Sequence, residues 1–133
     1  MTESTAAVLD AAKALISVFG AHDTAAYFAG FSEDASFIFY YEDKPLRDLN
    51  AYRKEWKRWE DDHDFAVKGC RSLNQIVQFV TPDVAVFLHD VETDIVYDGT
   101  LNTRFERETI LFRQQPDGRW LAVHEHLSKA ELA

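Results

Sequence analysis

The chain of 133 residues has one cysteine, few basic residues and no long apolar segment. Because Cys70 has no second cysteine to pair with, no internal disulfide can form, which is typical of a protein from a reducing cytoplasm. The 14 Lys and Arg residues face 23 Asp and Glu residues, and the net charge of −9 argues against nucleic acid or an anionic membrane as a partner. The first residues lack the basic start of a signal peptide, and no apolar run approaches the length of a membrane span. We therefore expect a soluble, cytoplasmic protein.

The sequence also lacks the motifs of several large enzyme classes. It has no Gly-rich phosphate loop, no Gly-x-Ser-x-Gly and no Cys-x-x-Cys. His124-x-His126 is the best candidate for metal binding, because residues two apart on a strand point the same way. Two ligands do not make a site, and no third ligand has a convincing spacing. We therefore expect no metal and no cofactor, and we expect Cys70 to be a buried small residue.

The composition suits a single domain over the whole chain, since 47% of the residues are hydrophobic and 14% are aromatic. Three helices are predicted in its first half. Apolar residues at helical spacing over 8–19 predict the first helix, which Gly20 ends. Asp23 can cap a short second helix that ends near Gly30, and Asp48 can cap the third helix.

The third helix carries an apolar stripe at positions i, i+3, i+7 and i+10, which is the spacing of a buried helix face. The stripe consists of Leu49, Tyr52, Trp56 and Trp59. Such a stripe either packs in the core or lines a pocket, and core packing is the more common role.

Strands are predicted for most of the remaining chain. The apolar run 35–41 predicts a strand that is buried on both faces. Two long strands follow, over 65–80 with an interruption near Gly69 and over 84–97, and another strand begins at Thr103. Helices followed by a run of antiparallel strands indicate an α+β domain.

The chain closes with a β-hairpin over residues 106–128. Apolar-rich runs flank the turn signal Gln115-Pro116-Asp117-Gly118. Alternation places Trp120 and His124 on one face of the second strand and Glu125 and Leu127 on the other. Because both faces then hold apolar residues, we expect both to be covered.

Two registers are possible for this hairpin. A four-residue loop pairs Gln114 with Arg119 and sets Glu108 opposite Glu125. A three-residue loop with a bulge at Gly118 sets Glu108 opposite His126 instead. We favour the first register.

The closing hairpin resembles that of SnoaL-like domains. The shared residues are Arg107-x-Thr109, Phe112-Arg113, Asp117-Gly118-x-Trp120 and Val123-His124-x-His126-x-Ser128. These domains belong to the nuclear transport factor two-like superfamily, and the resemblance is nearest to its calcium/calmodulin-dependent kinase association-domain branch. The resemblance implies a cystatin-like and ketosteroid isomerase-like α+β barrel, in which a cone-shaped, curved antiparallel sheet and three N-terminal helices close a pocket. This superfamily hosts isomerases, dehydratases, cyclases, binding proteins and assembly modules, so the fold does not assign a function.

The resemblance also bears on the lining of the pocket. Relatives in the association-domain branch hold anionic ligands with basic and polar residues, but the matching positions here are Ala51, Val91, Ile110 and Leu127. We therefore expect a pocket for an apolar or aromatic small molecule. The residues expected to line it are Phe39, Tyr52, Trp56, Trp59, Phe87, His89, Val91, Ile110 and Leu127.

Three titratable residues stand out against this apolar lining, namely Glu108, Glu125 and His89. Two facing carboxylates in an apolar pocket repel each other and lose water, so one of them should keep its proton near neutral pH and act as a general acid or base. His89 on the adjoining strand can relay a proton or orient the pair. Alternatively, a carboxylate reaches solvent at the rim of the sheet or pairs with Arg104 or Arg107.

Two functions of different classes follow from these residues. The first is a small, cofactor-independent acid–base enzyme of the isomerase, dehydratase or cyclase type that acts on an apolar or aromatic molecule. The second is a non-catalytic small-molecule-binding or association module. A buried pair of carboxylates that shares a proton favours the enzyme, whereas acids confined to the rim favour the module. In either case the strand over 84–97 is apolar on both faces while the helices cover one, so we expect a homodimer through the sheet.

Overall fold

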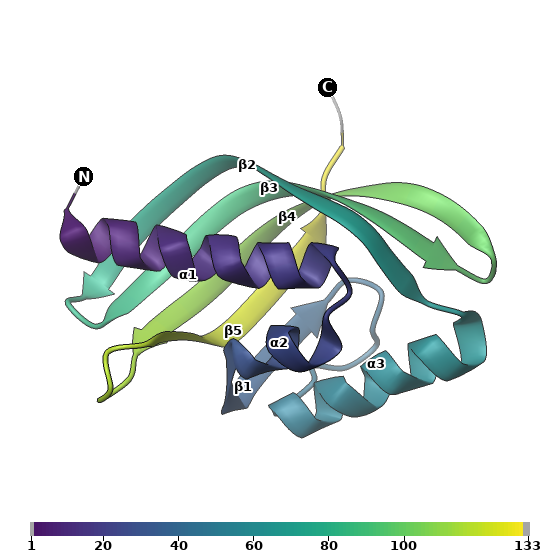
Figure 1. Cartoon of the computed structure of the whole chain (residues 1–133), viewed down its shortest axis with the longest axis horizontal. Coiled ribbons are helices and arrows are strands. Elements are labelled where there is room, and N and C mark those ends of the chain that lie inside the picture. The colour runs from purple at the N-terminus through teal and green to yellow at the C-terminus, as the bar shows by residue number, and fades with distance from the viewer. Residues whose placement is uncertain (1, 132–133) are drawn as a thin grey trace.

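A computed structural model of the chain describes residues 2–131, which form three helices and five strands. Their order is α1 (Glu3–Gly20), α2 (Thr24–Ala29), β1 (Phe31–Phe39), α3 (Leu49–His63), β2 (Ala66–Thr81), β3 (Val84–Tyr97), β4 (Thr100–Gln114) and β5 (Trp120–Lys129). The strands form one curved sheet, α1 lies across it, and α2 and α3 lie near β1 (Figure 1). The predicted α+β fold with a curved sheet is confirmed.

The strand order in the sheet is β1-β5-β4-β3-β2. The strands β2 to β5 are antiparallel neighbours, as predicted. β1 instead pairs with β5 in parallel, with Phe37 opposite Glu125 and Phe39 opposite Leu127. The prediction of a wholly antiparallel sheet was wrong at this edge, because β1 and β5 are far apart in the chain and no hairpin fixes their relative direction.

The helix ends follow the capping residues. Asp23 and Asp48 cap α2 and α3, as predicted, and each carboxylate accepts a hydrogen bond from a backbone N–H in the first turn. α1 begins at Glu3, earlier than predicted, because Thr2 caps it, and it ends at Gly20. Within residues 2–131, no helix is long and apolar enough to span a membrane.

β1 differs from its prediction in position and in burial. It begins at Phe31 and ends before Tyr40, because the chain turns back there and Phe37 forms two backbone hydrogen bonds with Leu46, at 2.8 and 2.9 Å. Phe37 is fully buried, whereas Ile38 is 37% exposed. The prediction of burial on both faces was wrong. β1 lies at the edge of the sheet, and its outer face, which carries Ile38, is not covered by any element in residues 2–131.

The closing hairpin has neither of the two predicted registers over its full length. Near the turn, Gln114 pairs with Trp120, which is the register of the three-residue loop, and Gly118 has a φ of 92°. The register then shifts by one residue between Leu111 and Phe112, so that Glu108 lies opposite Leu127. The favoured register was therefore wrong, and the alternative holds only beside the turn.

The register shift is a bulge at Val123, and it changes which side chains share a face. Ala122 before the bulge and Glu125 after it are both buried on the concave side of the sheet. Strict alternation had placed them on opposite faces. The apolar residues on both sides of this strand therefore reflect the bulge, and they do not show that both faces are covered.

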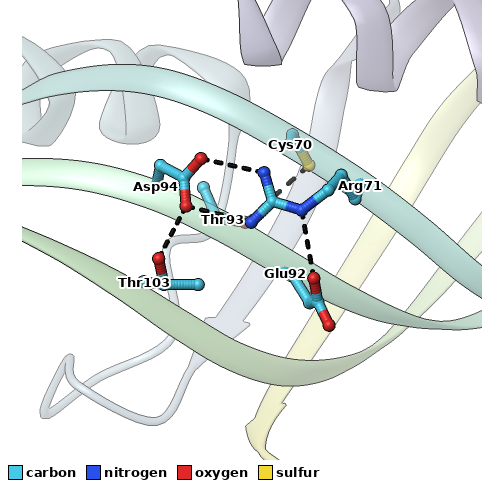
Figure 2. Close-up of polar contacts among 6 residues, drawn as sticks. All are labelled: Cys70, Arg71, Glu92, Thr93, Asp94 and Thr103. Carbon is cyan, nitrogen blue, oxygen red and sulfur yellow. Dashed lines mark hydrogen bonds and ion pairs between the residues drawn. The ribbon is translucent and has the colours of Figure 1, made fainter.

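The two faces of the sheet differ in chemistry along β2 and β3. On the convex face Arg71 donates two hydrogen bonds to Asp94, at 2.8 and 3.0 Å, and one to Glu92 at 3.0 Å (Figure 2). Cys70 and Thr93 alternate with these residues and belong to the concave face, where Thr93 is buried. The concave face, which the helices cover, holds the core and the cavity described next.

Candidate functional site

A cavity of about 410 Å³ lies between the concave face of the sheet and the three helices. Its size is within the usual range for small-molecule sites. Aromatic side chains from every helix contribute to its wall, and carboxylates from β4 and β5 contribute to its floor. The lining residues used below are Tyr27, Tyr52, Trp56, Cys70, Arg104, Glu106, Glu108, Ile110, Glu125 and Leu127.

Glu125 and Glu108 form a buried pair of carboxyl groups in this cavity. Glu125 is only 4% exposed, and its side chain is hydrogen-bonded to that of Glu108. Burial raises the pKa of Glu125 well above its usual range, and the charge of Glu108 and their shared hydrogen bond raise it further. Burial in the cavity therefore favours the protonated form of Glu125 over its ionised form.

The two carboxyl groups meet diagonally rather than directly. Glu125 pairs with Ile110 across the β4–β5 ladder, and Glu108 pairs with Leu127. Diagonal neighbours on one face of a sheet are about 7–8 Å apart, which long side chains can bridge. The bulge at Val123 therefore changes the predicted geometry of the pair but keeps the two side chains on one face.

His89 lies behind Glu108, on the neighbouring strand. The two residues are direct partners in the β3–β4 ladder, and Nε2 of His89 lies 2.6 Å from Oε1 of Glu108. The imidazole ring is completely shielded from solvent and also lies outside the cavity lining. The structure thus brings all three predicted titratable residues together, with His89 touching the pair from the core side.

Two tyrosines face the carboxyl pair from the helices. The hydroxyl oxygens of Tyr27 on α2 and Tyr52 on α3 are 3.0 Å apart. Burial raises the pKa of each phenol, and the nearby Glu125 raises it further, so both hydroxyls stay protonated and can donate hydrogen bonds. Sequence reasoning identified Tyr52 as lining but missed the Tyr27 hydroxyl, because nothing in the sequence pairs these two residues.

Glu106 is a third carboxyl group on the cavity floor that sequence reasoning missed. It is 4% exposed, the hydroxyl of Tyr40 donates to it at 2.7 Å, and burial raises its pKa. Arg104 lies on the same face of β4, with its guanidinium above the ring of Tyr41 at 5.4 Å. Period-two alternation from Glu108 would have found both Glu106 and Arg104.

The mouth of the cavity carries further charged groups. Burial and the neighbouring Glu55 raise the pKa of Glu42 to about 7. Arg58 donates two hydrogen bonds to Glu55, and they lower the pKa of Glu55 to about 2. The cavity is therefore apolar along its aromatic walls but polar at its mouth and floor. The sequence had predicted a largely apolar lining, without these polar regions.

Most of the residues predicted to line the pocket do so, namely Tyr52, Trp56, Trp59, Val91, Ile110 and Leu127. Phe39, Phe87 and His89 do not. Phe39 stacks on Tyr41, which separates it from the cavity, and Phe87 is fully buried against His89 and Phe112.

Cys70 and the histidine pair are not catalytic candidates. Burial raises the pKa of the Cys70 thiol to about 12, and Sγ lies 3.7 Å from the hydroxyl of Thr93. His124 lies on the convex face, where its Nδ1 is 2.8 Å from Oγ of Ser36. Among residues 2–131, no cluster of three or more His, Cys, Asp or Glu side chains is arranged to hold a metal ion.

Solved structures with this architecture share little sequence with the chain. A ketosteroid isomerase-like protein from Erwinia carotovora atroseptica is 17% identical, with 99% of this chain and 100% of that chain covered and a TM-score of 0.79. A putative aromatic ring hydroxylase from Novosphingobium aromaticivorans is 20% identical, with 98% and 91% covered and a TM-score of 0.81. A protein with a cystatin-like fold from Caulobacter vibrioides is 16% identical, with 98% and 92% covered and a TM-score of 0.78. These likenesses concern the fold alone.

The search of curated proteins found no match to this chain. A model of the SnoaL-like domain matches residues 8–131, which include most of α1, all of α2 and α3, and the five strands of the sheet. The match also includes each residue of the carboxyl pair and both tyrosines that face it. The chain therefore belongs to the family of SnoaL-like domains.

Proposed function

We propose that this chain is a small acid–base enzyme that works without a cofactor, of the isomerase, dehydratase or cyclase type. One observation carries the proposal, namely that the buried Glu125 lies beside Glu108 in the cavity, where burial and Glu108 both raise its pKa. A neutral carboxylic acid beside a charged carboxylate supplies a proton donor and a proton acceptor at one place. A carboxyl group at the rim of the sheet would not have this property.

The arrangement supports a proton transfer next to a carbonyl group. The carboxylate of Glu108 takes a proton from the carbon beside the carbonyl. The electron pair of that C–H bond forms a C=C bond, and the π pair of the carbonyl group moves onto its oxygen to form an enolate. A hydroxyl of Tyr27 or Tyr52, or the protonated Glu125, donates a hydrogen bond to that oxygen. Return of the proton to a different carbon completes an isomerisation. In a dehydration, the enolate expels a hydroxyl group from the next carbon, and that group takes a proton from Glu125 and leaves as water.

The cavity wall supports an apolar or aromatic substrate. Tyr52, Trp56 and Trp59 present flat apolar surface on the helix side, and Ile110 and Leu127 face them from the sheet. The charged residues at the mouth favour a substrate with one polar end. The name of the ketosteroid isomerase-like neighbour agrees with a ring-shaped ketone. The closer kinship with the kinase association-domain branch stays a prediction.

The proposal is tested by hydrogen–deuterium exchange at carbon. The chain is incubated in deuterated water with a panel of ketosteroids, cyclic β,γ-unsaturated ketones and aryl ketones, and NMR follows loss of the proton beside the carbonyl. We expect exchange or double-bond migration with at least one ketone. Glu108→Gln should reduce the rate by at least about 100-fold, the usual contribution of a general base.

Glu33→Gln is the matched control, because it makes the same chemical change at a side chain that is 78% exposed, far from the cavity. It should leave the rate unchanged. If every ketone binds, as judged by tryptophan fluorescence, but none exchanges, the chain is the non-catalytic binding module instead. Equal rates for Glu108→Gln and the wild type would remove Glu108 from the chemistry.

A further inference from the structure

The edge strand β2 departs from regular pairing with β3 at three points, and one of them lies directly opposite His89. Two residues of β2, Asn74 and Gln75, face this single histidine on β3. Asn74 has a φ of 56°, in the left-handed region that residues with a side chain seldom adopt, and its amide donates to Asp90 at 2.8 Å. Bulges of this kind re-aim the side chains beside them and are frequent next to functional sites.

The bulge places the side chain of Gln75 against Ser72. Nε2 of Gln75 donates to Oγ of Ser72 at 2.9 Å, and Oγ of Ser72 lies 2.6 Å from Nδ1 of His89. Nε2 of His89 lies 2.6 Å from Glu108 on its other side. A continuous chain of hydrogen bonds therefore runs from the half-buried Ser72, through the buried His89, to the carboxyl pair in the cavity.

One assignment of the protons satisfies every contact in this chain of hydrogen bonds. The oxygen of Ser72 already accepts from Gln75, so its own proton is available for Nδ1 of His89. A neutral imidazole that accepts at Nδ1 carries its proton on Nε2, where it points at Glu108. The opposite tautomer would place the lone pair of Nε2 against the oxygens of a carboxylate, which is unfavourable in a buried site.

We propose that Ser72, held by Gln75, is a positioning residue that fixes His89 as the neutral tautomer protonated on Nε2. His89 then donates to Glu108 from the core side while the protonated Glu125 donates to it from the cavity side. These two hydrogen bonds hold Glu108 as the charged carboxylate and leave a lone pair free toward the cavity. The catalytic meaning of this role rests on the proposed function, in which Glu108 is the base and Glu125 the acid.

Nitrogen NMR of the histidine rings tests the proposal on the intact, ligand-free chain. In the wild type at neutral pH, we expect an unprotonated Nδ1 and a protonated Nε2 for His89, with a slowly exchanging Nε2 proton. Ser72→Ala removes the donor to Nδ1, so the Nδ1 resonance should move and the Nε2 proton should exchange with water about fivefold faster, the factor that corresponds to a typical net hydrogen-bond contribution of about 1 kcal/mol. Ser72→Thr keeps a hydroxyl and should restore the wild-type resonances.

The chain offers a matched control at the other edge of the sheet. Oγ of Ser36 lies 2.8 Å from Nδ1 of His124, which is the same kind of contact on the convex face. Ser36→Ala should change the resonances of His124 and leave those of His89 as they are. Comparison of the two alanine variants thus separates the effect on His89 from any general loosening of the sheet.

Two results would overturn the proposal. One is a protonated Nδ1 in wild-type His89 at neutral pH, whether in the other tautomer or in the doubly protonated ring. The other is a Ser72→Ala variant whose His89 resonances and exchange rate equal those of the wild type. Neither measurement uses a substrate, so a chain that catalyses no exchange on any ketone but shows the expected tautomer contradicts only the proposed function.

Discussion

Replacement of Glu125 by glutamine tests the buried acid at the centre of the site through stability alone. The folded chain binds the proton of Glu125 more tightly than the unfolded chain does, because burial and Glu108 raise its pKa. The resulting stabilisation is fully present below the unfolded pKa of about 4.3, and it is lost as the pH rises through the folded pKa. Within that window, one such group lowers the free energy of unfolding by about 1.4 kcal/mol per pH unit.

Glutamine cannot ionise, yet it keeps an N–H donor for Glu108 and a similar shape. From about pH 5 upward, the wild type should therefore lose stability relative to Glu125→Gln by about 1.4 kcal/mol per pH unit, until the folded pKa is passed. For a chain of this size, that slope corresponds to roughly 5 °C in melting temperature per pH unit. Other shifted groups, such as Glu106 and Asp94, are present in both proteins and cancel in the difference.

Urea unfolding of both proteins, followed by circular dichroism in small pH steps from about pH 5 to about pH 8, measures this difference directly. Glu33→Gln serves as the control and should run parallel to the wild type, since its carboxylate is mostly exposed. Parallel profiles for wild type and Glu125→Gln across the whole window would show that Glu125 is ionised in the folded chain. The assignment of Glu125 as the acid would then be wrong.

Three further predictions concern assembly, ligand preference and the cysteine. A homodimer through the convex face of the sheet should give twice the 15.3 kDa monomer mass in light scattering at micromolar concentration. Leu88→Glu should give the monomer mass instead. A monomeric wild type would contradict the predicted dimer. Aromatic or alicyclic compounds should quench tryptophan fluorescence and raise the melting temperature more than small dicarboxylates do, because Trp56 and Trp59 line the cavity; the reverse order would mean that the charged mouth dominates binding. The thiol of Cys70, whose pKa burial raises to about 12, should react with a thiol reagent at pH 8 far more slowly in the native chain than in urea, and equal rates would place Cys70 in open solvent.

The helices and most strand positions could be predicted because their signals are local. Asp23 and Asp48 cap the helices they were expected to cap, and the stripe that begins at Leu49 is buried along its whole length. β3 spans Val84–Tyr97, as its alternation and its flanking turns indicated. β4 begins at Thr100 rather than Thr103, because the turn at Asp98 and Gly99 is tighter than the prediction allowed.

The faces of β5 could not be predicted, because the bulge at Val123 has no sequence signal of its own. Trp120, Ala122 and Val123 are all apolar, so a shift of register by one residue leaves a plausible pattern on either face. Only the sheet around them decides the register. The chain keeps Trp120 and Ala122 buried beside the turn and buries Glu125 and Leu127 beyond it.

The candidate site was predictable in its members and less so in its geometry. Glu108, Glu125 and His89 were conspicuous because polar residues interrupt apolar strands, and they do meet. Contacts that depend on distant segments, such as the hydroxyl pair of Tyr27 and Tyr52 or the approach of Ser72 to His89, leave no pattern in the sequence. They arise from the placement of α2 and from the bulge in β2, both of which are set by tertiary packing.

The burial of several acids on one wall also bears on the choice between an enzyme and a binding module. Burial of a carboxyl group costs free energy, and apolar residues of similar volume would pack the concave face at lower cost. The chain nevertheless places Glu106, Glu108 and Glu125 together there and adds His89 behind them. Flat apolar ligands need no such group, since the aromatic wall already provides the contact surface. A cluster of this kind, in which burial raises the pKa of Glu106 and of Glu125, supplies the proton donors that proton transfer requires, and it therefore favours the enzyme.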